Sequence, residues 1–294
     1  MSRNSFRETV VGYLFIGPLM IGMILFTLIP IAVSLILSFT DWSLVQGIKD
    51  ITFVGFKNFT YLFQDPVFIK SVKNNLIFML VVPITMAISV VLAVLLNSNV
   101  YMKGLFKVIF FIPYISSVVA IAMVSQVIFH PSYGPINELL RTFGIENPPL
   151  WLADHDYALI TLMLITIWMG IGYKLIIYMA GLQNIPQELY EAADIDGASG
   201  ITKFFKITLP LLSPTSFFLL ITGIIASFKV FDIIVVLTEG GPSDSTSVMV
   251  FYLYKQAFVN MKTGLASASS IVLVLIVLGI TLVQFLAQKK WVNY

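Results

Sequence analysis

The sequence predicts an all-α polytopic membrane protein with six transmembrane helices, and three observations lead to this fold class. Hydrophobic residues make up 58% of the 294 positions and charged residues only 11%, whereas soluble domains carry about 25% charged residues. Several runs without Asp, Glu, Lys or Arg reach the roughly 20 residues that a helix needs to cross a bilayer. These runs are continuous rather than alternating, which favours helices over a membrane β-barrel. Helices also satisfy every backbone polar group within the lipid.

Six spans follow from these apolar runs. They are expected near residues 11–39, 75–97, 106–130, 157–182, 212–237 and 264–288. The predicted domain organisation is a short cytoplasmic N-terminal segment, 1–10, followed by one six-span domain, 11–294. The first span could instead be a cleaved signal peptide, because Arg3 and Arg7 precede it. Its length and the lack of a small-residue cleavage site favour a retained span.

Prolines interrupt several of these spans. They are tolerated in membrane helices where neighbouring groups satisfy the freed backbone, and here each is either a functional kink or a feature of local packing: Pro18, Pro30, Pro83 and Pro113. With the N-terminus inside, the cytoplasmic segments carry Lys and Arg at a higher density than the outer loops. The distribution of these basic residues therefore predicts that both termini lie in the cytoplasm.

Several classes of function are excluded by what the sequence lacks. There is no cysteine and no Gly-Lys pair, so thiolate chemistry and a Walker A nucleotide site are both absent. No basic run with interleaved aromatic residues indicates binding of nucleic acid. The two histidines, His130 and His155, fall at the predicted outer edge of the membrane and predict neither a metal site nor an intramembrane protease. We expect no catalytic residue and no metal, which leaves transport or anchoring.

A polar stretch between the fourth and fifth spans, residues 183–213, contrasts with the apolar chain around it. Pro186 suits the first turn of a helix, which is expected over Gln187–Ile195. Gly197 and Gly200 then permit a helix stop and a change of direction. A second short helix is expected over 201–208, with Pro210 ending it. The stretch should therefore form two short helices at the membrane surface, on the cytoplasmic side.

The first of these short helices presents a mixed, acidic face. Glu188, Glu191, Ala192 and Ile195 recur at helical spacing. Small alanines at 192, 193 and 198 would let a partner approach closely. An amphipathic helix lying on lipid is the alternative, but such helices are usually basic, whereas this one begins with four acids: Glu188, Glu191, Asp194 and Asp196. The acidity favours a protein partner with an Arg-lined groove.

The same stretch resembles a known signature. Its pattern is similar, spacing included, to the cytoplasmic "EAA" signature of permease subunits of bacterial binding-protein-dependent ATP-binding cassette (ABC) importers, and the matching residues are Glu191, Ala192, Ala193, Gly197, Ile207, Leu209 and Pro210. Further segments resemble the carbohydrate-uptake branch, which includes maltose-type and glycerol-phosphate-type permeases: 30–42, 53–78, 133–140, 151–154 and 228–246. The resemblance runs from about residue 11 to the end.

The resemblance implies a type I importer permease in the bacterial cytoplasmic membrane. Loop 183–213 would contain the coupling helix, seated in a groove of a separate ATPase subunit that binds ATP and Mg. The residues expected to meet or shape this contact are Glu188, Glu191, Ala192, Ala193, Asp196, Gly197, Ile207, Leu209 and Pro210. Further implied partners are a second permease, usually similar but not identical, and an extracellular binding protein. Alternating access would then move a sugar, an oligosaccharide, glycerol phosphate or another polar metabolite.

The solute pathway is expected where charges fall inside spans, since such charges are costly in lipid. Three residues meet this criterion: Lys174, Lys229 and Asp232. Lys229 and Asp232 lie three apart on one predicted helical face, where they would pair with each other or contact solute. For Lys174, snorkelling toward the inner end of its span is favoured.

Aromatic residues near these charges could stack on sugar faces, although packing is the commoner role of aromatics in spans. They are Trp168, Tyr173, Phe228 and Phe231. A self-sufficient secondary carrier or channel is the alternative to an importer subunit. Secondary carriers commonly show inverted repeats, and the sequence shows no convincing internal repeat.

Overall fold

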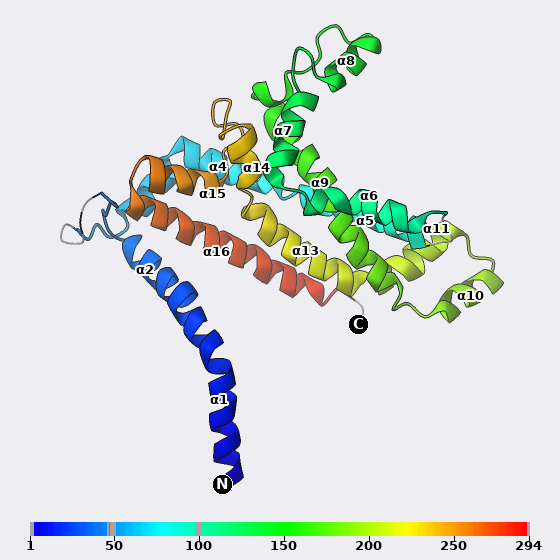
Figure 1. Cartoon of the computed structure of the whole chain (residues 1–294), viewed down its shortest axis with the longest axis horizontal. Helices are drawn as coiled ribbons and strands as arrows, with labels where there is room; N and C mark the ends of the chain where they lie inside the picture. Colours follow the sequence, from blue (N-terminus) through cyan, green and yellow to red (C-terminus); the bar gives the residue numbers. More distant parts are fainter. Residues whose placement is uncertain (1–2, 46, 48–50, 98–100, 293–294) are drawn as a thin grey trace. The chain divides into compact units, whose positions relative to one another are not determined.

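The computed structural model describes residues 3–45, 47, 51–97 and 101–292, and every regular element within them is a helix. The chain divides into two compact units. The first comprises residues up to Asp65 together with Leu253–Val274, and the second comprises Pro66–Tyr252 together with Leu275–Tyr294. Figure 1 shows the helices of each unit. The predicted all-α membrane class is confirmed.

The first unit begins with one long helix in three parts: α1 (Arg3–Met23), a π-helical turn at Ile24–Leu28 and α2 (Ile29–Leu37). The predicted N-terminal segment, 1–10, is therefore largely the start of this helix, and residues 1 and 2 lie outside the described range. Residues 8–37 are apolar and long enough to cross a membrane. At the π turn, the amide of Ile29 donates to the carbonyl of Ile24. This wider turn comes just before Pro30, whose ring would clash with a regular preceding turn.

In the first unit, polar and aromatic contacts hold the segment that follows α2. Residues after α2 lead to α3 (Lys57–Gln64), and a second π-helical turn at Lys255–Val259 precedes α16 (Thr263–Gln288). The side-chain amide of Asn58 donates to the carbonyls of Ser38 and Thr40, both at 2.9 Å. The ring of Phe39 packs against those of Phe56 and Phe59, with centroids 5.3 Å apart in each pair.

The number of unbroken spans differs from the prediction. Four helical segments are long and apolar enough to cross a membrane, over residues 8–37, 66–97, 158–182 and 263–288. They correspond to the first, second, fourth and sixth predicted spans. The second begins nine residues before the predicted start, because α4 (Pro66–Phe78) runs with a short break into α5 (Val81–Asn97). Two bent helix pairs, 103–115 with 118–128 and 200–211 with 213–228, would raise the number to six if each pair is counted as one crossing.

The prediction of one helix over 106–130 is wrong. Two helices, α6 (Lys103–Ile115) and α7 (Val118–Ile128), meet at an angle of 98°. Pro113 removes an amide donor near the end of α6, and Ser116 then takes an extended conformation with ψ of 152°. A proline that ends regular bonding two to three residues before an extended residue gives a sharp break rather than a gentle kink.

The prediction of one helix over 212–237 is also wrong. It consists of α13 (Ser213–Phe228) and the short α14 (Asp232–Leu237), with three non-helical residues between them. Lys229 is the C-cap of α13 and Asp232 lies in the first turn of α14. A cation at a helix C-terminus and an acid at a helix N-terminus are both favourable, which provides a physical reason for a break at this pair of charges.

Helix α9 (Ala158–Leu182) is the centre of the second unit and packs against α5, α6 and α13. Glycines allow the closest of these contacts. A Cβ on Gly172 would lie 2.1 Å from the carbonyl oxygen of Phe110 on α6, so no other residue fits at this point. Leu175 and Tyr178 are almost fully buried on the next turns. Small residues commonly permit such backbone contact between membrane helices.

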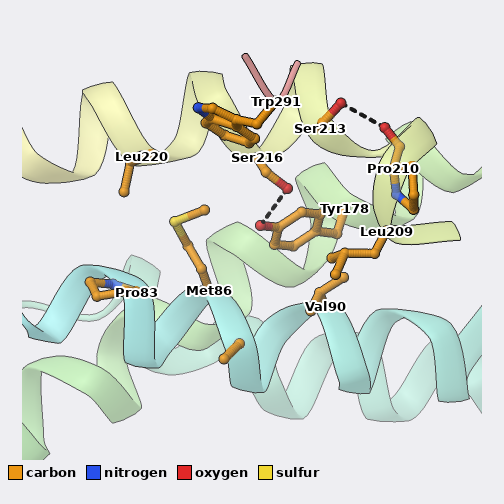
Figure 2. Close-up of a pocket in the computed structure, with 11 residues that line it drawn as sticks. Pro83, Met86, Val90, Tyr178, Leu209, Pro210, Ser213, Ser216, Leu220 and Trp291 are labelled. Atoms are coloured by element: carbon orange, nitrogen blue, oxygen red, sulfur yellow. Dashed lines mark hydrogen bonds between the residues drawn. The ribbon is translucent and has the colours of Figure 1, made fainter. Parts of the chain in front are cut away.

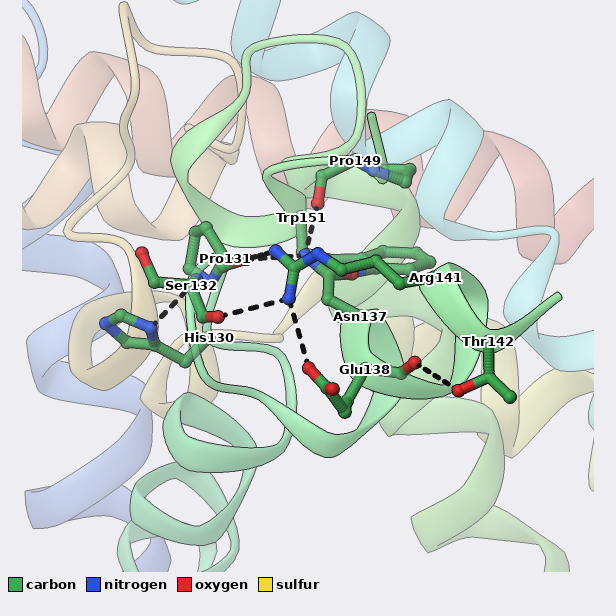
Figure 3. Close-up of polar contacts among 9 residues, drawn as sticks. All are labelled: His130, Pro131, Ser132, Asn137, Glu138, Arg141, Thr142, Pro149 and Trp151. Carbon is green, nitrogen blue, oxygen red and sulfur yellow. Dashed lines mark hydrogen bonds and ion pairs between the residues drawn. The ribbon is translucent and has the colours of Figure 1, made fainter. Parts of the chain in front are cut away.

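One end of α9 is joined to a folded loop that contains α8 (Pro135–Thr142) and a 3-10 turn at Trp151–Ala153. Figure 3 shows how polar groups hold this loop. The side-chain amide of Asn137 donates to the carbonyls of Pro131 and Pro149 at 2.9 and 3.0 Å, and its oxygen accepts from the indole of Trp151. Arg141 donates to the carbonyls of Ser132 and Pro131. These hydrogen bonds fix the path of the loop on both sides of α8.

Candidate functional site

Loop 183–213 leaves the other end of α9 and begins with α10 (Gln187–Ile195), at the predicted bounds. The helix ends at Gly197, whose φ is +72°. The amide of Gly197 donates to the carbonyl of Asp194, and the amide of Ala198 donates to that of Ala193. These two bonds form a Schellman motif, which requires a left-handed residue at the glycine position. The predicted turn at Gly197 is confirmed.

The second short helix differs from the prediction in its course. It begins as α11 (Gly200–Lys203), with the hydroxyl of Ser199 accepting from the amide of Thr202. It continues through a π-helical turn at Phe204–Thr208 into α12 (Leu209–Leu211). Pro210 therefore does not end the helix. A π-helical turn precedes Pro210, as another precedes Pro30. Its wider backbone avoids the clash between the proline ring and the preceding turn.

Two side-chain contacts brace the short helices against each other. The hydroxyls of Tyr190 and Thr208 lie 2.9 Å apart, and the ammonium of Lys203 lies 2.5 Å from a carboxylate oxygen of Asp194. Asp194 is 65% exposed at its side chain, so the ion pair contributes little alone. Together with the Schellman motif, the contacts give the loop one defined shape.

Most of the predicted contact residues lie at the surface of this loop. Exposed positions include Glu188, Glu191, Ala192 and Asp196, and Ile195 is 88% exposed. A single exposed isoleucine is ordinary at a protein surface and does not by itself indicate a contact. Ala193 differs, because it is only 8% exposed. It lies on the inward side of α10, so its small size serves packing within this chain.

The remaining predicted residues lie where the loop returns to the spans. Ile207 is half-buried in the π turn. Leu209 and Pro210 line a cavity of about 460 Å³ between α5, α9 and α13. Figure 2 shows this cavity, with the hydroxyl of Tyr178 donating to that of Ser216 at 3.1 Å. These residues thus join the loop to the helices, whereas α10 presents the exposed face.

A second cavity lies farther along α9 and contains the predicted pathway charges. Its volume is about 370 Å³, and its lining includes Lys174, Lys229, Phe231 and Asp232. The prediction that Lys229 and Asp232 share one helical face is wrong, because the chain is not helical between them. Among the described residues, no ion pair joins them.

The orientation of Lys174 also differs from the favoured prediction. Its ammonium lies 3.3 Å from the position that a Cβ on Gly170 would occupy. Gly170 is one turn closer to the start of α9, so the side chain extends away from the end that joins loop 183–213. Lysines that snorkel extend toward the nearest membrane surface. Lys174 instead points along the cavity.

The predicted aromatic residues are not brought together. Phe228 is fully buried at 0% exposure, so it packs within the chain and does not reach a solute. Trp168 lines a different cavity, beside Ser116 and Phe129. Tyr173 stacks on Tyr114 with ring centroids 4.9 Å apart, and Tyr114 lines the cavity that contains Lys174. Of the four aromatics, only Phe231 lines that cavity directly.

Two asparagines on α4, Asn74 and Asn75, were not identified from the sequence, and their side chains hold segments that line or adjoin this cavity. The amide nitrogen of Asn75 donates to the carbonyl of Ser227 at 3.3 Å, and its oxygen accepts from the amide of Met249 at 2.8 Å. Asn74 donates to the carbonyls of Ser245 and Ser247. The available signal was a pair of asparagines within an apolar run. Within the described ranges, no group of three or more His, Asp or Glu residues is placed to hold a metal ion.

Comparison with known proteins identifies the family. The profile described as "Binding-protein-dependent transport system inner membrane component" matches residues 86–292. The chain belongs to this family of transport permeases. The permease is 37% identical to the probable ABC transporter permease protein YesP of Bacillus subtilis, over 100% of this chain and 95% of that protein. It is 35% identical to the lactose transport system permease protein LacF of Rhizobium radiobacter, over 98% of each.

Further similarities extend along the whole permease. It is 32% identical to the sn-glycerol-3-phosphate transport system permease protein UgpA of Pectobacterium atrosepticum, over 100% of this chain and 99% of that protein. A bacterial ABC transporter involved in import of the acidic polysaccharide alginate contains a chain of the same fold, with a TM-score of 0.85, 24% identity and 99% of each chain covered. The predicted resemblance to carbohydrate importer permeases is confirmed, as is location in a membrane.

Proposed function

We propose that this permease is the transmembrane pathway subunit of an ATP-driven importer that moves a sugar or a related polar metabolite by alternating access. The observation that carries the proposal is the whole-length similarity to permeases of lactose and glycerol-phosphate transport systems. A bacterial alginate transporter with a chain of 25% identity and a TM-score of 0.84 is described in complex with a periplasmic protein that holds an alginate pentasaccharide. This supports delivery of the solute by an extracellular binding protein.

In the proposed importer, loop 183–213 couples the permease to ATP hydrolysis on a partner subunit. The support for this role is the braced shape of the loop and the exposed face that includes Glu188, Glu191, Ala192 and Asp196. Acidic groups there suit an Arg-lined groove on an ATPase subunit, where bidentate pairs form. ATP and Mg would remain on that partner, with no cofactor on this chain. A second, similar permease would complete the pathway, and the loop would lie in the bacterial cytoplasm.

Capture of the partner ATPase tests this proposal. The permease is co-expressed with a candidate ATPase, second permease and binding protein from the same organism, and is purified by a tag on this chain. Glu191→Lys should reduce the ATPase recovered by about 10-fold, because a lost charge-assisted contact costs about 1.5–3 kcal/mol. The matched control is Glu146→Lys, at another exposed acid, near α8, which should leave recovery unchanged.

Transport by the purified chain provides the second arm of the test. In proteoliposomes, the complete set of subunits should take up solute only with internal ATP, and the chain alone should take up none. Ion-gradient-driven uptake by the chain alone would establish a secondary carrier and overturn the proposal. Equal recovery of the ATPase with Glu191→Lys and with wild type would overturn the assignment of the coupling face.

A further inference from the structure

The cavity beside α9 contains one positive charge that the fold leaves unbalanced. Three charged residues line this cavity: Lys174, Lys229 and Asp232. Within the described part of the chain, the ion pairs are those of Arg141, His155 and Lys203 with nearby acids, and none includes the cavity charges. Among the residues that the structure describes, none donates or accepts a hydrogen bond to the side chains of these three. Each of the three charges therefore needs its own source of stabilisation.

Two of the three charges have a local explanation. Lys229 is the C-cap of the 16-residue α13, where the helix dipole favours a cation. Asp232 lies in the first turn of α14, where an acid is favoured. Both are also exposed. With these opposite charges close in sequence at a helix break, their combined contribution to the cavity is near zero.

Lys174 has no such explanation. It lies in the interior of α9, eight residues before the end at Leu182, which is about 12 Å along the axis. Its side chain is half-buried and extends the opposite way, over Gly170. An ammonium at this depth is costly unless it meets a partner. The ammonium lies close over Gly170, which has no side chain: a Cβ there would be 3.3 Å from the ammonium and 3.3 Å from the methyl group of Thr85.

We propose that Lys174 binds an anionic group of the transported solute, and that the solute is an acidic or phosphorylated sugar rather than a neutral one. This inference rests on the proposed importer function. The shared chemistry is an oxyanion, either a carboxylate or a phosphate, which accepts charge-assisted hydrogen bonds from the ammonium. The cavity of about 370 Å³ and the aromatic ring of Phe231 in its lining provide room and apolar contact for the sugar ring.

Matched solutes test the charge of the cargo. The cognate binding protein is first screened with digalacturonate against its dimethyl ester, with glucose 6-phosphate against glucose, and with lactose. The member bound best is used for ATP-driven uptake by the complete importer in proteoliposomes. We expect an anionic member to be bound and transported, with the two anionic probes separating carboxylate from phosphate. Binding of neutral members only, or of no anionic member, would overturn the inference.

Substitution then tests the residue. Lys174→Met should raise the KM for the anionic solute by about 10-fold or more, as expected for a lost hydrogen bond to a charged group, and Lys174→Arg should restore most of the loss. Lys229→Met, in the same cavity, is the matched control with a smaller effect. Wild-type uptake with Lys174→Met would overturn the inference. Loss of subunit assembly in both Lys174 variants would also overturn the inference. It would show that the ammonium contacts another subunit and not the solute.

These outcomes are separate from failure of the proposed function. The uptake assay uses importer that already retains its ATPase and hydrolyses ATP. If no ATPase is recovered with the wild-type chain, the importer function fails and not only the charge of its solute. If ATP-driven uptake occurs but the cargo is neutral, only the role of Lys174 fails.

Discussion

Asn75 on α4 shows how one buried side chain can fix two segments distant in sequence. Its amide contacts the carbonyl of Ser227 and its oxygen accepts from the amide of Met249. Ser227 lies one residue before the end of α13 and lines the cavity with Lys174. The side chain therefore holds the helix break that the cavity requires. Both backbone groups would lose a partner if the asparagine amide were removed.

We expect Asn75→Leu to destabilise the permease by about 2–4 kcal/mol, because it leaves two buried backbone groups unpaired at about 1–3 kcal/mol each. The measurement is thermal unfolding in detergent. Asn184→Leu, at an exposed position after α9, makes the same chemical change and should leave the unfolding temperature nearly unchanged. Equal shifts for the two variants would contradict the role given to Asn75.

At the residue scale, the sequence identified charged residues within apolar runs but not the directions of their side chains. Lys174, Lys229 and Asp232 stood out in this way, and they line one cavity, while the pathway role expected for Lys229 and Asp232 stays a prediction. The buried position of Phe228 and the direction of Lys174 depend on neighbouring helices. Such contacts between segments far apart in sequence cannot be derived from spacing alone.

Among the elements, α10 was predicted with its correct bounds, because its signals are local. Pro186 precedes it, and Gly197 closes it with positive φ. The π-helical turns before Pro30 and Pro210 were not predicted. A proline signals disturbed bonding, but whether the helix stops, bends or widens depends on packing around it. The 98° break after Pro113 and the continuation through Pro210 show two of these outcomes.

The Schellman motif gives a prediction at this scale. Gly197→Ala places a side chain at φ of +72°, which costs about 1–2 kcal/mol for an L-residue. We expect the end of α10 to fray and recovery of the ATPase to fall several-fold. Gly200→Ala is the control, since Gly200 opens α11 with open space around it. A loss of recovery with Gly200→Ala as large as with Gly197→Ala would refute this account.

For the whole molecule, the sequence was sufficient to predict a helical membrane fold and the permease family. It was less successful with the number of unbroken helices. Hydropathy measures only whether a segment is apolar, so α6 and α7 were merged, as were α13 and α14. Each predicted single helix is broken in the structure, one after a proline and the other at a pair of charged residues. The count of six crossings depends on treating two bent pairs as single spans, 103–115 with 118–128 and 200–211 with 213–228.

The direction of insertion is open to a direct test, because the chain contains no cysteine. Single cysteines are placed at two exposed positions, Gln187 at the start of α10 and Ser132 in the loop before α8. With cytoplasmic termini, a membrane-impermeant maleimide added to intact spheroplasts should label Ser132→Cys and not Gln187→Cys. Opened membranes should allow labelling of both. The reverse pattern in spheroplasts would invert the predicted topology.

Gly172, where α9 touches the backbone of α6, has a consequence for recognition of the cargo. Rotation of α9 about its own axis decides whether the ammonium two residues later meets the cavity or the lipid. That rotation is set where a missing methyl group permits contact with Phe110. Under the role proposed for Lys174, selectivity would depend on Gly172 as well, because a single carbon atom added there would turn the ammonium aside.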